Sequence, residues 1–196
     1  HYAIPHAVAA YLARQILAAS PPRKIPQIVT TLHGTDVTII GSDESYFETA
    51  AFCIDQSDAV TAVSDSLRHE TYRQLRVNAE IRVIPNFLDR RHHRRVTDDS
   101  LGARYRNGDA RTKLVIHISN FRPVKRADAV VKIFHRIKQR VPARLLLIGD
   151  GPELPLARRV ARELGLSADV DALGEQEQVV PILSVADVFL LPSSEE

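Results

Sequence analysis

The sequence predicts an α/β protein with two parallel sheets, each covered by helices, and three observations support this. Helix-like and strand-like stretches alternate along most of the chain, which is the order that produces parallel sheets. Two strand-like stretches, 113–119 and 144–148, are apolar in the way expected of strands buried on both faces. A polar stretch separates two blocks of this alternation. We therefore expect one domain over 1–88, a connection over 89–111 and a second domain over 112–196.

The first block supplies three helices and three strands. In chain order they are a helix around 5–19, a strand at 27–32, a helix at 43–56, a strand at 59–63, a helix from 64 to about 76 and a strand at 81–84. Ser64 is the expected N-cap of the third helix, because its hydroxyl can accept a backbone N–H. Asp65 then lies in the first turn, where the helix dipole favours an acid.

The second block begins after a stretch that loses apolar periodicity and collects Arg, His, Asp and Gly. Its expected elements are a strand at 113–119, a helix at 124–140, a strand at 144–148, a helix after 149–152, a strand at 169–173, a short helix at 177–183 and a strand at 187–191. Pro152 suits the first position of its helix, because its missing N–H would have no partner there.

Composition and charge exclude several classes of function. Lys and Arg number 26 against 24 Asp and Glu, too small an excess for a surface that coats nucleic acid. The basic run at 90–95 has no interleaved aromatic residues and is followed by Asp98 and Asp99, which favours a solvated connection. No apolar run approaches the roughly 20 residues that span a bilayer, so no membrane association is predicted. The lone Cys53 cannot form an internal disulfide, which fits a cytoplasmic location.

The chain also carries signs of being a fragment. Methionine is absent, including at position 1, and the strand expected at 187–191 is followed by only five residues. We expect both sheets to be incomplete, and the isolated 196-residue chain to have little or no activity of its own.

Ligands of open parallel sheets bind beyond the carboxyl ends of the strands, so the residues that follow each strand are candidates for a site. Four places qualify: Thr31–Asp36 with His33, Ser119–Arg126, Gly149–Glu153, and Ser193–Glu196. A lone histidine at a strand end is more often a surface residue, and glycines in a strand-to-helix turn are often needed for geometry alone. Two acids at a terminus are usually solvated. No Cys/His spacing typical of a metal site is present, so no metal cofactor is expected.

The loop of residues 119–126 carries the strongest chemical signal. Arg122, Lys125 and Arg126 gather where a strand passes into a helix. Free amides at a helix N-terminus and long cationic side chains together suit a diphosphate, and they can neutralise its oxygens without a metal. A solvated basic turn is the alternative, and the residues alone leave both readings open.

Taken in order, these stretches resemble the retaining glycosyltransferases of the GT-B architecture, in the large family (family 4, or group 1) that includes sucrose-phosphate, mannosyl and glycogen synthases. The resemblance covers the whole chain and implies two Rossmann-like domains with a donor cleft between them. The stretches that carry it are His1–Ala7, Thr31–Asp36, Val83–Phe87, His117–Arg126 and Leu147–Glu153. Residues 119–126 are the most specific of these, whereas Gly149–Glu153 is shared widely across the superfamily.

On the donor side the resemblance assigns roles to individual residues. Lys125 matches the family's diphosphate-binding lysine, and Glu196 matches the first acid of a Glu-x7-Glu motif that lies against the donor sugar. The family's partner arginine usually stands where this chain has Asn120, so Arg122 would supply that charge from another place. The implied donor-binding residues are Ser119, Asn120, Arg122, Lys125, Gly149 and Glu196.

On the acceptor side, His33 matches a histidine near the reacting centre, and Tyr2 and Thr35 match acceptor-binding positions. His33, Lys125 and Glu196 are the residues to which the resemblance gives catalytic importance. Retention in this family is attributed to attack on the face from which the diphosphate departs. That mechanism requires charge stabilisation on the leaving group more than a protein base.

Within the family the closest likeness is to the enzymes of bacillithiol biosynthesis that transfer N-acetylglucosamine from UDP-N-acetylglucosamine to L-malate. The resemblance thus implies a hexosyltransferase whose partners are a UDP-sugar and a small hydroxy-acid, and it allows a homo-oligomer. Two alternatives stay open. One is a family member with another donor or acceptor, and the other is a non-catalytic nucleotide-sugar-binding domain on the same fold.

Overall fold

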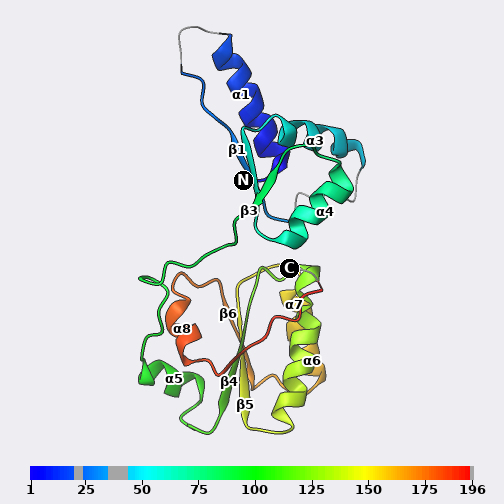
Figure 1. Cartoon of the computed structure of the whole chain (residues 1–196). Coiled ribbons are helices and arrows are strands. Elements are labelled where there is room, and N and C mark those ends of the chain that lie inside the picture. The colour runs from blue at the N-terminus through cyan, green and yellow to red at the C-terminus, as the bar shows by residue number, and fades with distance from the viewer. Residues whose placement is uncertain (20–23, 35–43, 195–196) are drawn as a thin grey trace. The chain divides into compact units, whose positions relative to one another are not determined.

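The computed structural model describes residues 1–19, 24–34 and 44–194. The chain forms two compact units, His1–Leu88 and Asp89–Glu196, and each contains its own parallel sheet (Figure 1). The predicted α/β class with two parallel sheets is therefore confirmed. No helix in the described part of the chain is both long and apolar enough to cross a membrane.

The first unit has a three-stranded sheet in the order β1-β2-β3, and both strand pairs are parallel. Its described elements are η1 (Ala3–Ala7), α1 (Val8–Ala18), β1 (Val29–Leu32), η3 (Glu44–Tyr46), α3 (Phe47–Asp55), β2 (Ala59–Ala62), α4 (Asp65–Leu75) and β3 (Ile81–Val83). The core lies between the sheet and the helices, where Leu32, Ile54 and Val60 are at most 1% exposed.

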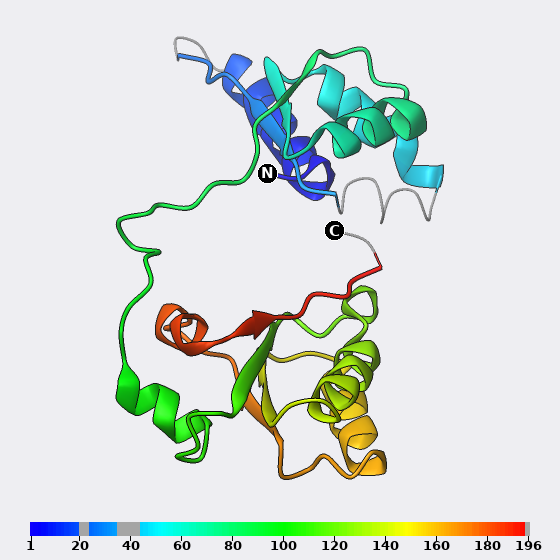
Figure 2. The same cartoon turned by 60° about the horizontal axis from the view of Figure 1, so that its bottom comes forward.

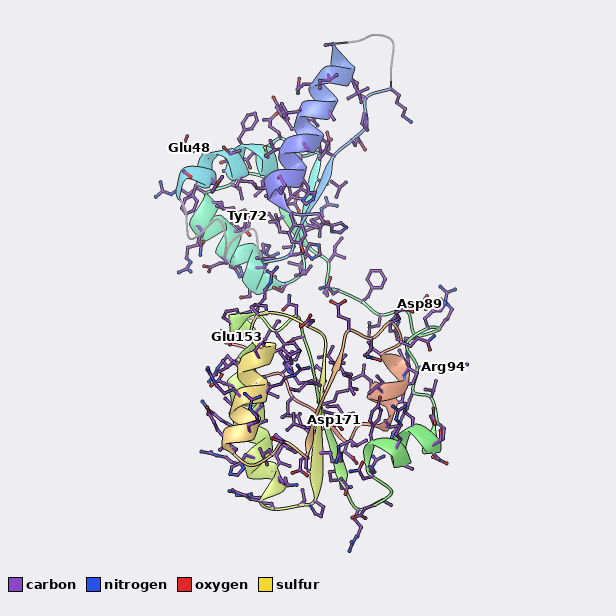
Figure 3. The ribbon with its side chains drawn as sticks, turned by 180° about the vertical axis from the view of Figure 1, so that it is seen from behind. Glu48, Tyr72, Asp89, Arg94, Glu153 and Asp171 are labelled. Atoms are coloured by element: carbon purple, nitrogen blue, oxygen red, sulfur yellow. The ribbon has the colours of Figure 1, made fainter. Side chains whose placement is uncertain are left out.

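The helix α4 begins as the sequence predicts. The Oγ of Ser64 accepts the N–H of Leu67 at 3.1 Å, and Asp65 occupies the first turn, so the predicted N-cap is confirmed. At the other end, the hydroxyl of Tyr72 accepts the N–H of Ile81 at 2.9 Å and donates to the carbonyl of Ala79 at 3.1 Å (Figure 3). This phenol therefore connects α4 to the start of β3.

The second unit has a four-stranded parallel sheet in the order β6-β5-β4-β7. Its elements are α5 (Asp99–Tyr105), β4 (Lys113–Ile118), η4 (Pro123–Lys125), α6 (Ala127–Lys138), β5 (Ala143–Ile148), α7 (Leu154–Glu163), β6 (Val170–Gly174), α8 (Val180–Val185) and β7 (Val188–Phe189). Helices α6 and α7 cover one face of the sheet, and α5 and α8 cover the other (Figures 1 and 2).

Both faces of this sheet are buried, which explains the continuous apolar runs of β4 and β5. Along β5, Leu145 and Leu147 pack under α6 and α7, whereas Leu146 and Ile148 pack toward α5 and α8. Because successive side chains point to opposite faces, a strand covered on both sides is apolar along most of its length.

The segment 89–111 differs from the expected connection, because it contains helix α5. The carboxylate of Asp98 caps this helix by accepting the N–H of Leu101 at 2.8 Å. The residues before α5 also bind to α8, where both contacts involve Ser184. The Nε of Arg95 donates to the carbonyl of Ser184 at 3.2 Å, and the N–H of Val96 donates to the Oγ of Ser184 at 3.0 Å. Tertiary contacts with α8 thus order a segment that local periodicity does not mark as helical.

Asp187, just before β7, joins that strand to β4. Its Oδ2 accepts the N–H of Leu114 at 2.8 Å and lies 3.1 Å from the Nη2 of Arg106, and its Oδ1 lies 3.6 Å from the Nζ of Lys113. Burial by itself raises the pKa of Asp187, but the Leu114 N–H and the two cations outweigh burial and leave the pKa lowered.

We expect the Asp187→Asn variant to be less stable than the parent protein near neutral pH, and the difference to shrink on acidification. The folded-state pKa is lowered, so the stabilisation is present above the unfolded pKa of about 3.9 and is lost as the pH falls through the folded value. Thermal unfolding midpoints between pH 7 and pH 3 measure this. Glu163→Gln, at an exposed ion pair with Arg159, is a control that should change little. A midpoint difference that stays constant over this pH range would contradict the assignment.

Candidate functional site

Three cations lie on the loop that follows β4, residues 119–126, here called the cationic loop. Phe121 anchors this loop, because its side chain is fully buried. The backbone of Phe121 has φ +42°. η4 then turns the chain, and Arg126, with φ +51°, leads into α6. Arg122 is exposed. Lys125 and Arg126 lie where the cationic loop meets α6. The structure therefore brings the predicted cations to the N-terminal end of a 12-residue helix.

The first turn of α6 remains compatible with an anion although it contains an acid. Asp128 lies in that turn, and the Nζ of Lys132 contacts its Oδ2 at 2.7 Å. The hydrogen bond from Lys132 is the main reason that the pKa of Asp128 is lowered. Its negative charge is thus partly neutralised within the helix, which weakens its repulsion of an anion at the first turn.

Hydrogen bonds hold the beginning of the cationic loop. The Oγ of Ser119 accepts the N–H of Phe121 at 3.1 Å and lies 2.8 Å from the Nε2 of His117, which is fully buried on β4. The Nδ1 of His117 lies 2.9 Å from the carbonyl oxygen of Leu190. The Ser119 hydroxyl, predicted to bind the donor, thus contacts the loop backbone at Phe121 and the side chain of His117 on β4. Sequence reasoning gave no role to His117.

The glycine turn after β5 packs directly against the cationic loop. A Cβ on Gly149 would lie 2.0 Å from the carbonyl oxygen of Ser119, and one on Gly151 would lie 1.9 Å from that of Asn120. The N–H of Glu153 also donates to the carbonyl of Phe121 at 2.8 Å, and Figure 3 shows Glu153 at the start of α7. Glycine is required here for close backbone approach. Contact of Gly149 with a donor remains a prediction.

The position predicted for Pro152 is wrong. Helix α7 begins at Leu154, and Pro155 is the proline of its first turn. Pro152 lies in the turn before the helix.

The tail after β7 runs to the cationic loop, as Figure 2 shows. The N–H of Leu190 donates to the carbonyl of Ile116 at 2.8 Å, and the N–H of Ser194 donates to that of Val124 at 3.0 Å. Ser194 therefore lies against the residue that precedes Lys125. Glu196, predicted to contact the donor sugar, lies outside the described residues.

In the first unit, two predicted residues from separate segments lie together. His33 follows β1, and the N–H of Tyr2 donates to the carbonyl of Thr31 at 2.9 Å. The ring centroids of Tyr2 and His33 are 5.3 Å apart, and the Nδ1 of His1 lies 2.7 Å from the Nε2 of His33. His6 adds a third imidazole, 6.0 Å from the Tyr2 ring. We call these four side chains the imidazole cluster.

Sequence reasoning missed two members of the imidazole cluster. His1 and His6 belong to the same short stretch as Tyr2, so their nearness in sequence was the available signal. Thr35, the other predicted acceptor residue, lies outside the described residues.

In the described part of the second unit, two of the cavities are lined by residues other than the predicted site residues. One of about 410 Å³ lies among α5, α8 and the residues before α5. One of about 690 Å³ lies along β6 between α5 and α7. Within the described ranges, no group of three or more His, Cys, Asp or Glu side chains is placed to hold a metal ion.

Comparison with known proteins gives a match for each part of the chain. The family model described as Glycosyltransferase Family 4 matches residues 1–92, and the one described as Glycosyl transferases group 1 matches residues 106–196.

Curated relatives extend this likeness. N-acetyl-alpha-D-glucosaminyl L-malate synthase of Bacillus anthracis is 44% identical over 196 residues, which is 100% of this chain and 50% of that protein. The putative glycosyltransferase EpsF of Bacillus subtilis is 31% identical over 118 residues. These residues are 58% of this chain and 30% of the length of EpsF. The chain thus spans half the length of the first relative and matches a smaller part of the second.

Solved structures share the fold. The Anabaena protein HepE, in complex with UDP-glucose, superposes with a TM-score of 0.75 and 21% identity over 97% of this chain and 50% of that one. Sucrose-phosphate synthase of Thermosynechococcus elongatus gives a TM-score of 0.71 with 20% identity, over 95% and 48% of the two chains. At these identities the likeness concerns the fold.

Proposed function

Because the chain belongs to the glycosyltransferases of family 4 and group 1, with their GT-B fold, we propose that the full-length protein transfers N-acetylglucosamine from UDP-N-acetylglucosamine to L-malate, with retention at the anomeric carbon. The observation that carries this proposal is the 44% identity, along the whole chain, with the Bacillus anthracis L-malate synthase. The placement of Lys125 and Arg122 at the start of α6 supports it independently.

The cationic loop would bind the donor diphosphate. Lys125, Arg122 and the amides of α6 would stabilise the charge that develops on the leaving group, which is the main requirement of same-face attack. Ser119 and Gly149 would act by fixing the loop, and Asn120 lies in it between Ser119 and Phe121. Glu196 would lie against the donor sugar.

The imidazole cluster would lie on the acceptor side. Tyr2 and His33 present a hydroxyl and a ring nitrogen within one group of side chains, and Thr35 follows His33 by two residues. Hydroxyl and imidazole groups suit the carboxylates of a small hydroxy-acid. A cytoplasmic location, at which the lone Cys53 stays reduced, belongs to the proposal, and a homo-oligomer remains a prediction.

The identity of the acceptor distinguishes the proposed activity from the alternatives, which are another family activity and a binding domain. We expect the full-length protein to glycosylate L-malate and to use D-malate poorly. Inverting one centre moves the hydroxyl away from the anomeric carbon while both carboxylates stay anchored, and a misplacement of about 1 Å can cost about 100-fold in rate. L-malate, D-malate and inositol phosphate are offered separately with UDP-N-acetylglucosamine. Mass spectrometry and proton coupling constants then identify the product and its anomeric configuration.

Each alternative predicts a different result. Transfer to inositol phosphate but not to malate would indicate a family member with another acceptor. Binding of the nucleotide sugar without transfer to any acceptor would indicate a binding domain.

A further inference from the structure

His117 contacts two segments of the donor side through its two ring nitrogens. A carbonyl can only accept, so the 2.9 Å contact with Leu190 places the ring hydrogen on Nδ1. The Oγ of Ser119 accepts the N–H of Phe121 at 3.1 Å and lies 2.8 Å from Nε2. Both ring nitrogens of His117 are therefore in hydrogen-bond contact, one with each segment.

The two segments that His117 joins are separate in sequence. Ser119 begins the cationic loop, whereas Leu190, 73 residues after His117, begins the tail that reaches Val124 through Ser194. The ring of Phe121 also packs edge-on against the imidazole, with centroids 5.4 Å apart. His117 is fully buried, so it cannot itself touch a ligand in this arrangement. Its influence on a ligand must pass through the backbone that it holds.

We infer that His117 is a positioning residue for the nucleotide-sugar diphosphate, an inference that rests on the proposed function. Through Ser119 it sets the path of the cationic loop and hence the place of Arg122 and Lys125. Through Leu190 it sets the path of the tail as far as Ser194. One imidazole thus fixes the spacing between the cationic loop and this tail.

Three substitutions in the full-length protein separate the two contacts. The side-chain amide of His117→Asn reaches only the position of Nδ1, so it keeps the contact with Leu190 and loses that with Ser119. His117→Gln reaches the position of Nε2 and does the opposite. Ser119→Ala is the mildest change, because it leaves the imidazole in place and removes only the hydroxyl.

We expect each single variant to bind UDP about 10-fold more weakly than the parent, which corresponds to about 1.4 kcal/mol. The double variant His117→Asn with Ser119→Ala should bind no more weakly than the weaker single variant, because both changes break the same contact. Calorimetric titration with UDP gives the affinities, and thermal unfolding gives the stability of each variant.

A destabilised control distinguishes positioning from a general effect on folding. Ile182→Ala removes a buried side chain of α8, on the core that faces away from α6 and α7, and should lower the unfolding midpoint while leaving UDP affinity unchanged. If the His117 and Ser119 variants also lose stability but keep their UDP affinity, the positioning role is overturned and the proposed activity is unaffected. If the parent binds UDP, the variants bind it weakly, and no variant or parent glycosylates L-malate, the proposed activity fails and the positioning role stands.

Discussion

Replacing Lys125 by alanine in the full-length protein is expected to weaken UDP binding by about 1.5–3 kcal/mol, roughly 10- to 150-fold. Lys125 is half-buried at the end of η4, two residues before the first residue of α6, where its ammonium group would donate a charge-assisted hydrogen bond to a phosphate oxygen. Affinity for the acceptor should change much less. Calorimetric titration with UDP and with L-malate measures both effects.

A second cation on the same helix provides the control for Lys125. Arg136 lies in the last turn of α6, at the end away from the cationic loop, so Arg136→Ala removes the same formal charge and should leave UDP affinity nearly unchanged. Equal losses in the two variants would show that only the overall charge of the domain matters. Unchanged affinity in Lys125→Ala would remove this residue from the diphosphate site.

Replacing Gly149 by alanine is expected to destabilise the second unit by about 2–6 kcal/mol. The new Cβ would lie 2.0 Å from the carbonyl oxygen of Ser119, and a side chain at φ +106° is strained in any surroundings. Strain of this kind costs about 1–3 kcal/mol, and overpacking against a fixed backbone adds about 1–3 kcal/mol more. Since the displaced atom belongs to the cationic loop, UDP affinity should fall with stability.

Gly165 separates the two contributions. It has φ +70°, and a methyl group added to it would meet nothing within 4 Å, so Gly165→Ala carries the backbone strain without the collision. We expect a loss of about 1–2 kcal/mol and no change in UDP affinity. Denaturant titration of both variants gives the comparison, and a Gly149→Ala loss no larger than that of Gly165→Ala would contradict the packing role.

The long apolar elements were predictable because their patterns reflect burial. The strand expected at 113–119 is observed at Lys113–Ile118, and the one expected at 144–148 at Ala143–Ile148, since a strand covered on both faces is apolar along most of its length. Helix α5 was not predictable. It has seven residues and a central Gly102, and its contacts with α8 come from a segment about 80 residues later in the chain.

Where the structure brings predicted site residues together, the signal in the sequence was either close spacing or the family resemblance. Arg122 and Lys125 share one loop, so their proximity follows from their spacing. Tyr2 and His33 were placed on the acceptor side by resemblance, and the structure brings their rings together. His117 escaped notice because a histidine inside an apolar strand resembles an ordinary core residue. Its partner Leu190 is 73 positions away, and no local pattern reveals such a contact.

The strand order β6-β5-β4-β7 reverses the direction in which the chain is wound. From β4 the chain moves outward through α6 to β5 and through α7 to β6, and then returns past β4 to β7 by way of α8 on the opposite face. The connections after β4 and those that lead to β7 therefore diverge at the carboxyl end of β4, and such a divergence is where open α/β sheets bind their ligands. We therefore expect relatives with different substrates to keep this strand order and to differ in the loops around it.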